Sequence, residues 1–286
     1  MLLATRVEIG VELRDMVEPD LPAAIELSQE YSWPHRQEDW ELFCELGEGI
    51  VAVRDCKVVG TILAWRMAEN YAMVGMVLVA TKMQGHGIGH QLMDAMLDRL
   101  KGRNIILNAT PESMPFYSKL GFVPTGVVRQ HQGTAPAVPL SELNLGERLR
   151  PMGNADVALP AMYSTAMSMD RTKVFNAMSR DAKTVVLSRD HEPAGFAMLR
   201  RFGRGGFIGP IVAPDIDGAK LLVSHCFGTR VGRFCRVDAV EGLGLSRWLE
   251  ALGLPCVATV TTMVKGTPPP VAEGPRVFAL ATQAFG

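Results

Sequence analysis

Cysteine is scarce in this sequence: there are five among 286 residues, and no two of them form a C-x-x-C pair. An odd number of scattered cysteines does not fit the spacing of a zinc site or of a disulfide framework. We therefore expect buried, reduced thiols in a cytoplasmic protein. The cysteines are Cys44, Cys56, Cys226, Cys235 and Cys256.

The chain also has no excess of charge of one sign and no long apolar run. The formal net charge is −1, which gives no basic footprint for nucleic acid or an anionic membrane. No apolar stretch approaches the roughly 20 residues that span a bilayer. Charged residues at Arg6, Glu8, Glu12 and Arg14 exclude a signal-peptide core at the start. We expect neither a nucleic acid nor a membrane as a partner.

Aromatic residues make up only 7% of the chain, but the hydrophobic fraction of 48% still provides an ordinary globular core. A chain of 286 residues is long for a single domain of about 150 residues. Length and composition therefore predict two domains.

A glycine-rich segment follows an apolar stretch at residues 72–79, which predicts a buried strand. Glycine recurs at Gly85, Gly87 and Gly89, and apolar residues at helical spacing follow over residues 90–100. Glycine permits close approach of the main chain to a ligand. The amides and the helix N-terminus add partial positive charge, so this segment suits a pyrophosphate.

The spacing narrows the kind of phosphate loop. A P-loop ends in Gly-Lys-Ser/Thr, whereas Gly89 is followed by His90 and Gln91. A dinucleotide fingerprint reads G-x-G-x-x-G and needs an acidic residue about 20 positions on, and neither is present here. A nucleotide triphosphatase and a dinucleotide site are therefore disfavoured, and a simple tight strand-to-helix connection is the remaining plain alternative.

The pattern Gln-x-x-Gly-x-Gly at Gln84, Gly87 and Gly89 resembles the coenzyme A pyrophosphate loop of the GNAT superfamily of N-acetyltransferases. Downstream, Phe-Tyr-Ser-Lys-Leu-Gly-Phe at residues 116–122 is similar to the last block of those enzymes, where a helix ends at glycine. The resemblance implies an α/β (α+β) fold of two tandem GNAT-like domains. Each has a mixed, mostly antiparallel central sheet flanked by helices.

The resemblance also implies site residues and acetyl-CoA as co-substrate, without a metal. The asparagine at the position of Asn108 binds the pantetheine arm, and the tyrosine at the position of Tyr117 protonates the leaving thiolate. Tyr117 could instead pack on the sheet, and a metal site at His86 and His90 would lack a third ligand. The expected cofactor-binding residues are Val77, Leu78, Val79, Gln84, Gly85, His86, Gly87, Ile88, Gly89, His90, Asn108 and Phe116.

The general base and the substrate residues are less clearly marked. Glu69 is the candidate base, with Glu30 and His35 as further candidates, although each could be an ordinary surface residue. Aromatic residues concentrate in the segment that carries substrate-binding loops in this family, where Trp40 suits the core. The expected substrate residues are Glu30, Tyr31, Trp33 and His35.

The second half of the chain repeats the first at a separation of 132–135 residues. Gly60 matches Gly195, and Gly75 matches Gly209 in similar apolar stretches. We therefore expect a catalytic GNAT domain at residues 1–145, the first copy, and a degenerate one at residues 146–286, the second copy.

The second copy lacks the features of a coenzyme A site. Asp215 and Asp217 stand where the glycine loop would be, and like charge would repel a pyrophosphate. Leu249 stands at the position of Tyr117. We expect this copy to shape the substrate cleft or to act as a scaffold. A basic cluster at Arg200, Arg201 and Arg204 is expected to be a solvated hairpin tip.

The sequence therefore predicts an N-acetyltransferase that moves an acetyl group from acetyl-CoA to a primary amine of a small molecule. Two alternatives stay open: a protein or peptide N-acetyltransferase, and a non-catalytic acyl-CoA-binding regulatory module. Binding alone would not require Tyr117, which favours an enzyme. We expect a monomer or a homodimer.

Overall fold

The structure, a computed structural model, describes residues 10–138 and 143–286. Arg6 and Glu8 lie outside the described residues. The chain divides into two compact units, one formed by residues up to 105 with Phe285, and one by residues 106–284 with Gly286. Both are mixed α/β units, as predicted.

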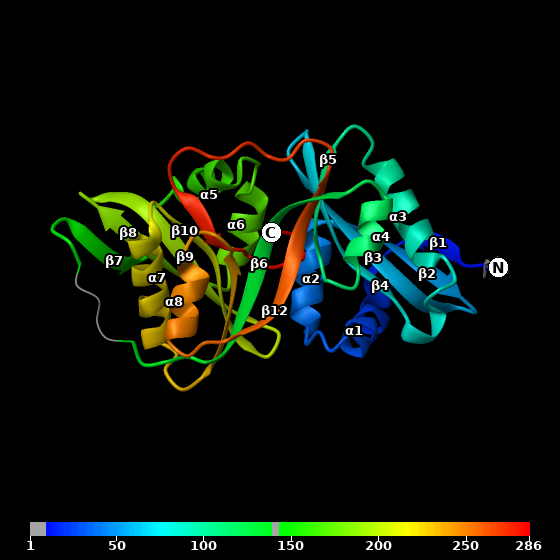
Figure 1. The fold of residues 1–286 in the computed structure, drawn as a ribbon, viewed down its shortest axis with the longest axis horizontal. Helices are drawn as coiled ribbons and strands as arrows, with labels where there is room; N and C mark the ends of the chain where they lie inside the picture. Colours follow the sequence, from blue (N-terminus) through cyan, green and yellow to red (C-terminus); the bar gives the residue numbers. More distant parts are fainter. Residues whose placement is uncertain (1–9, 139–142) are drawn as a thin grey trace. The chain divides into compact units, whose positions relative to one another are not determined.

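The first unit has an antiparallel sheet in the order β1-β2-β3-β4 (Figure 1). One helix, α3, packs on this sheet through Leu92, Met93 and Met96, which are fully buried. These are residues that the helical spacing predicted to share a face. The elements are β1 (Glu12–Asp15), α1 (Leu21–Glu30), α2 (Gln37–Leu46), β2 (Glu48–Arg54), β3 (Lys57–Met67), β4 (Tyr71–Val79) and α3 (Ile88–Arg99), with 3-10 turns at Glu18–Asp20 and Thr81–Met83.

Strand β5 (Asn104–Ala109) begins in the first unit and ends in the second. The second unit continues with α4 (Met114–Lys119), β6 (Val123–Thr134), β7 (Glu147–Pro151), α5 (Leu159–Met167), α6 (Thr172–Ser179), β8 (Lys183–Arg189), β9 (Glu192–Phe202), β10 (Gly205–Ala213), α7 (Ile216–Gly228), β11 (Phe234–Val240), α8 (Leu245–Ala251), β12 (Cys256–Lys265) and β13 (Arg276–Ala279). Its strand order is β5-β12-β6-β11-β13-β10-β9-β8-β7.

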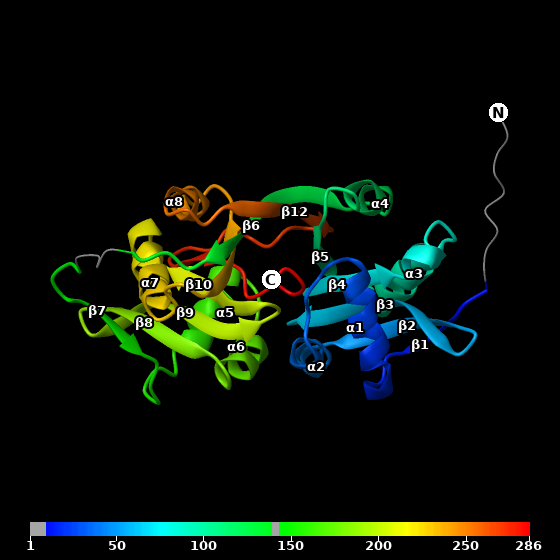
Figure 2. The same ribbon diagram turned by 90° about the horizontal axis from the view of Figure 1, so that it is seen from below.

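Helices cover both faces of the β8–β10 part of this sheet (Figure 2). Neighbouring residues of a strand point to opposite faces. Phe196 contacts Tyr163 of α5 and Phe175 of α6, whereas Ala197 belongs to the hydrophobic cluster that includes α7. Even-numbered residues here therefore face α5 and α6, and odd-numbered residues face α7.

The two copies repeat each other in detail. Strands β3 and β9 both have 11 residues and the same order of buried and exposed positions. An ion pair also recurs: Arg14 binds Asp20 with Nη–Oδ distances of 2.7 Å, and Arg150 binds Asp156 at 2.6–2.7 Å. The guanidinium hydrogen bond lowers the pKa of each aspartate. The same local structure therefore opens each copy.

Strands β6 and β12 are exchanged between the copies. Strand β12 of the second copy follows β5 in the strand order and pairs with β6, with Val260 opposite Val128. On its other side β6 of the first copy pairs with β11 of the second, with Val240 opposite Val128 (Figure 2). The two compact units divide near residue 105. The boundary between the two sequence repeats at residue 145 remains a prediction.

Candidate active site

The glycine loop, residues 84–89, connects the turn after β4 to the first residues of α3. Gly85 and Gly87 have φ angles of +80° and +84°, a region that favours glycine. A Cβ added at either position would meet no atom within 4 Å, so both residues face open space. Gly87 is the N-cap of α3, and as a glycine it brings no side chain to cap the helix. The start of α3 is therefore uncovered.

The main-chain donors of this loop are unused. Among the hydrogen bonds of the described residues, none has the N–H group of Gly85, His86, Gly87, Ile88 or Gly89 as its donor. The ring of His86 is positioned by Met83, whose carbonyl oxygen lies 3.3 Å from Nδ1 of His86. Five adjacent N–H groups at a helix N-terminus fit a pyrophosphate. The residues present therefore suit the phosphate end of coenzyme A.

Tyr31 connects the loop to the end of β4. Its hydroxyl donates to the carbonyl oxygen of Val79 at 2.7 Å and accepts from Nε2 of Gln84 at 2.6 Å. The neighbouring carboxylate of Glu30 accepts from the N–H of Thr81 at 2.8 Å. Two residues expected to contact substrate, Glu30 and Tyr31, thus lie beside residues expected to bind the cofactor.

Strand β4 is bulged before it reaches the loop. Met76 has a φ angle of +52°, and its carbonyl oxygen accepts from Oγ1 of Thr61 at 2.8 Å. Here the pairing with β3 shifts register between Thr61 and Leu63. Bulges of this kind redirect the strand and are common beside active sites. Past the bulge, Leu78 is fully buried, whereas Val77 and Val79 are half-buried.

Trp33 and His35 form a row of tilted and edge-on ring contacts from Tyr31 to the core of the first unit. Trp33 lies 5.8 Å from Tyr31 and 5.9 Å from His35, measured between ring centroids. His35 in turn contacts the rings of Trp40 and Phe43, which are fully buried. The core role expected for Trp40 is confirmed, and Trp33 and His35 remain half-buried at its edge.

Glu69 lies away from the glycine loop. It is exposed in the turn between β3 and β4, whereas the loop follows the other end of β4. Strand β4 runs from Tyr71 to Val79, so its two ends are about 25 Å apart at about 3.3 Å per residue. The structure does not bring this candidate base together with the loop.

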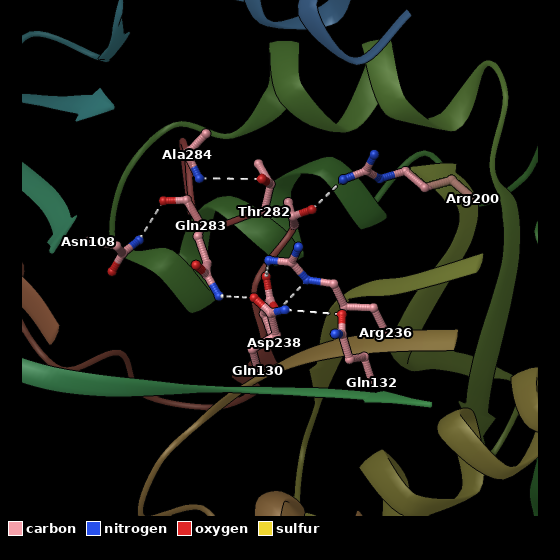
Figure 3. Close-up of polar contacts among 10 residues, drawn as sticks. Asn108, Gln130, Gln132, Arg200, Arg236, Asp238, Thr282, Gln283 and Ala284 are labelled. Carbon is pink, nitrogen blue, oxygen red and sulfur yellow. Dashed lines mark hydrogen bonds and ion pairs between the residues drawn. The ribbon is translucent and has the colours of Figure 1, made fainter. Parts of the chain in front are cut away.

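Asn108, Phe116 and Tyr117 lie in the second unit. Nδ2 of Asn108 donates to the carbonyl oxygen of Gln283 at 2.8 Å (Figure 3). Oδ1 of Asn108 accepts from Oγ1 of Thr262 at 2.8 Å. A ligand that binds this amide would have to replace these partners.

Tyr117 is buried on α4, with 7% of its surface exposed. Its ring lies 5.0 Å from that of Phe116 and 5.9 Å from that of Phe122. The helix ends before Gly121, whose φ angle of +86° confirms the expected glycine after the last turn. Packing therefore fixes the ring of Tyr117.

A polar cluster between β6, β11 and the residues after β13 was not predicted from the sequence (Figure 3). Asp238 is fully buried and binds Arg236 through bonds of 2.7 and 2.8 Å. Oε1 of Gln130 accepts from Gln283, and its Nε2 donates to Gln132, both at 3.2 Å. The one available signal is the alternation of polar residues at two-residue spacing within two strands.

The start of α7, which corresponds to the start of α3, is closed by its own side chain. Oδ1 of Asp215 accepts from the N–H of Gly218 at 2.7 Å, as a helix N-cap. Arg189 binds the other carboxylate oxygen at 2.8 Å, and this bond lowers the pKa of Asp215. Arg189 also binds Glu147 at 2.8 Å. This helix N-terminus is therefore already neutralised.

The space beside β10 is also filled. Strands β10 and β11 pair in parallel at Gly206–Cys235 and Phe207–Arg236. Further along, β13 lies between them, with Ala279 opposite both Ile211 of β10 and Ala239 of β11. The chain itself thus supplies the strand that occupies this opening.

In the part of the chain that the structure describes, no three His, Cys, Asp or Glu side chains gather as metal ligands would. Within the same residues, no helix has both the length and the apolar character of a membrane span.

Known proteins resemble this chain in sequence and in overall fold. The chain is 22% identical over 285 residues to an uncharacterized N-acetyltransferase, YitH, of Bacillus subtilis (strain 168), and the match covers 96% of this chain and 98% of that protein. A putative acetyltransferase from Pyrococcus horikoshii has a similar structure, with a TM-score of 0.81 at 19% identity over 97% of this chain and 96% of that one. A tandem GNAT protein from the clavulanic acid biosynthesis pathway gives a TM-score of 0.64 at 14% identity, over 90% and 98% of the two chains.

Models of the acetyltransferase (GNAT) domain match the chain twice, at residues 37–139 and at residues 161–279. One match lies in each copy of the repeat, and together they cover most of the chain. The chain therefore belongs to the GNAT acetyltransferases and carries two GNAT domains in tandem.

Proposed function

We propose that this protein transfers an acetyl group from acetyl-CoA to a primary amine of a small molecule by direct attack. The observation that carries the proposal is the uncovered start of α3, where five adjacent N–H groups of the glycine loop have no acceptor among the described residues. Main-chain donors at a helix N-terminus bind phosphate well. GNAT domains in both copies support acyl transfer as the chemistry.

In this proposal each group of residues has one task. The N–H groups of the glycine loop bind the pyrophosphate, with Gln84 held in place by Tyr31. The main chain of Val77 and Val79 aligns the thioester arm. Bound acetyl-CoA supplies an activated acyl group with a thiolate as its leaving group. Tyr117 donates a proton to that thiolate, because a developing negative charge on sulfur needs a nearby O–H donor.

The acceptor amine is proposed to enter beside Glu30, Tyr31, Trp33 and His35. Tyr31 and Glu30 adjoin the end of β4 and the turn after it, and the rings of Trp33 and His35 extend from Tyr31. Aromatic rings beside a carboxylate suit a small amine. Glu69 gains no support as the base, since β4 separates it from the loop.

One working site in each chain is proposed, in the first copy. Asp215 closes the corresponding helix start in the second copy, and β13 fills the opening beside β10. We propose that residues 146–286 serve as a scaffold or shape the substrate cleft of a cytoplasmic enzyme, which acts as a monomer or homodimer.

The test is release of the coenzyme A thiol from acetyl-CoA, followed with DTNB across a panel of small amines and short peptides. We expect turnover with a small amine, and a Tyr117→Phe variant should turn over about 10²- to 10⁴-fold more slowly with unchanged affinity for acetyl-CoA. Tight binding of acetyl-CoA without turnover of any amine would instead identify a binding module, and turnover of peptides alone would reassign the substrate.

A further inference from the structure

The second unit contains a cavity of about 300 Å³ at the edge where β8 begins and β9 ends. Its walls come from three places in the sequence: the start of β8, the β9–β10 hairpin and the turn after α7. Basic residues predominate among those that line it. The lining residues are Asp181, Lys183, Leu199, Arg200, Arg201, Gly205, Thr229, Arg230 and Arg233.

Arg200 contributes no charge to this cavity. Its guanidinium binds the carbonyl oxygen of Ala281 (Figure 3). The same group lies over the rings of Phe202 and Phe207, at 4.6 and 4.9 Å from their centroids. Because neighbouring residues of a strand alternate, Arg201 points to the opposite face, which is the face covered by α7. Lys183 shares that face, since Val185 and Leu187 on the same strand pack in the hydrophobic cluster with α7.

In the first copy, the positions equivalent to Lys183 and Arg201 carry opposite charges. Glu48 opens β2 as Lys183 opens β8, and Arg66 stands near the end of β3 as Arg201 does in β9. In the first copy this pair is a salt bridge, with Nε of Arg66 2.6 Å from Oε1 of Glu48. In the second copy a lysine replaces the glutamate. The two positions that hold a glutamate and an arginine in the first copy thus hold a lysine and an arginine in the second.

Arg230 and Arg233 add to this charge from the turn after α7. Neither they nor Lys183 form an ion pair with a carboxylate of the described residues. Nη2 of Arg230 donates to the carbonyl oxygen of Phe234 at 3.3 Å, while its buried Nε has no hydrogen-bond partner among these residues. Its guanidinium lies against Gly206, where an added Cβ would be 3.0 Å away.

Four cationic side chains therefore share the cavity with one carboxylate, that of Asp181. Like charges held close together repel, and the partial negative charge at the end of α7 offsets this only in part. An oxyanion in the cavity would neutralise the positive charge that Lys183, Arg230 and Arg233 leave without a carboxylate partner. Guanidinium groups match phosphate oxygens in pairs, and a volume of about 300 Å³ is at the lower end of small-ligand sites.

We propose that this cavity of the second copy binds a small phosphorylated molecule, with Lys183, Arg201, Arg230 and Arg233 as the ligands of its phosphate groups. The site is independent of the glycine loop in the first copy. It gives the second copy a binding function although that copy lacks an open helix N-terminus.

The test is calorimetric titration of the full chain with inorganic pyrophosphate at low salt. Lys183→Glu restores the charge pattern of the first copy, so we expect it to weaken the binding of pyrophosphate at least tenfold without loss of thermal stability. Arg230→Gln should weaken binding similarly, and Arg230→Lys should retain part of it. Lys173→Glu, an exposed lysine on α6 outside the cavity, is the matched control and should bind within twofold of the wild type.

Equal binding by the wild type, Lys183→Glu and Arg230→Gln would overturn the proposal. The glycine loop is intact in every one of these proteins, so pyrophosphate bound there contributes the same heat to each titration. If Lys183→Glu does not fold, Arg233→Ala at an exposed position replaces it, with the same expected loss of affinity. Absence of acetyltransferase activity would leave this result unaffected.

Discussion

Helices α3 and α7 occupy equivalent places in the two copies but begin in opposite ways. The start of α3 has a glycine N-cap and main-chain donors without acceptors, whereas the start of α7 has an aspartate that accepts from Gly218 and binds Arg189. The donors of a helix N-terminus are satisfied either by the protein itself or by a ligand. The comparison shows that a few residues decide whether the protein itself satisfies these donors, while the surrounding fold stays the same.

The strands give the same lesson. Both β4 and β10 shift register relative to their hairpin partners, β4 at Met76 and β10 between Ile208 and Ile211. Beside β10, however, the chain inserts β13. The second copy thus uses its own residues to fill the places that a ligand would need.

The largest effect is expected at the open helix start. Gly87→Val forces a branched residue into a φ angle of +84° and places a side chain where the phosphates would bind, so we expect acetyl-CoA affinity to fall at least about 100-fold. Gly102→Val is the matched control, because Gly102 has the same φ angle and equally open surroundings, but follows α3. Calorimetry with acetyl-CoA measures both.

The two variants should lose similar thermal stability, which separates strain from binding. If Gly87→Val and Gly102→Val lose acetyl-CoA affinity equally, the open start of α3 is not the binding site for the phosphates. The converse change, Asp215→Gly in the second copy, should lower stability by only about a few tenths of a kcal/mol through loss of the N-cap and leave the stoichiometry at one acetyl-CoA per chain. A second bound acetyl-CoA would show that β13 does not close that copy.

A second, smaller effect concerns the ion pairs that both copies share. Asp20→Asn and Asp156→Asn should each lower the free energy of unfolding by about 1–3 kcal/mol at pH 7, because each leaves an arginine and a main-chain N–H without their charged partner. The folded-state pKa of both aspartates is lowered, so this stability is present above the usual pKa of 3.8 and is lost as the pH falls through the lower folded value.

Denaturant titrations of the wild type and both variants between pH 7 and pH 2 measure this effect. The gap between wild type and variant should narrow only below about pH 4. If the difference in free energy of unfolding already narrows near neutral pH, these carboxylates are not its source. If only one of the two variants is destabilised, the two ion pairs contribute differently to stability despite their equal geometry.

The smallest effect is expected at Tyr31. Tyr31→Phe removes the hydroxyl that holds Gln84 beside the open helix start, and one lost hydrogen bond of about 1 kcal/mol corresponds to about a fivefold rise in the KM for acetyl-CoA. Steady-state kinetics should show this rise while the turnover rate stays nearly unchanged. A turnover rate reduced by about two orders of magnitude would instead place the hydroxyl of Tyr31 in the chemical step.

Local patterns were predictable from the sequence. Glycine spacing located the uncovered start of α3, and the position of Gly121 predicted the end of α4, because both depend on neighbouring residues. The repeat likewise predicted matching strands in both copies. The aspartates after β10 were also recognised, although their sequence did not show that Asp215 caps its own helix.

Contacts between distant residues were not predictable. The partners of Asn108 are Thr262 and the carbonyl group of Gln283, far along the chain, and no local spacing indicates them. Glu69 was a candidate base, but it lies before β4, and this extended strand separates it from the glycine loop at the other end. The pairing of β6 with β11 is likewise set by the whole fold and not by either strand.

The exchange of β6 and β12 has a consequence for synthesis. A ribosome completes β6 of the first copy long before residues 256–265 exist, so the nascent chain carries a 12-residue strand that lacks both of its final neighbours. Exposed strand edges of this kind favour aggregation. We expect the first copy to mature only when β12 emerges, so that the two copies reach their final state together although one is made first.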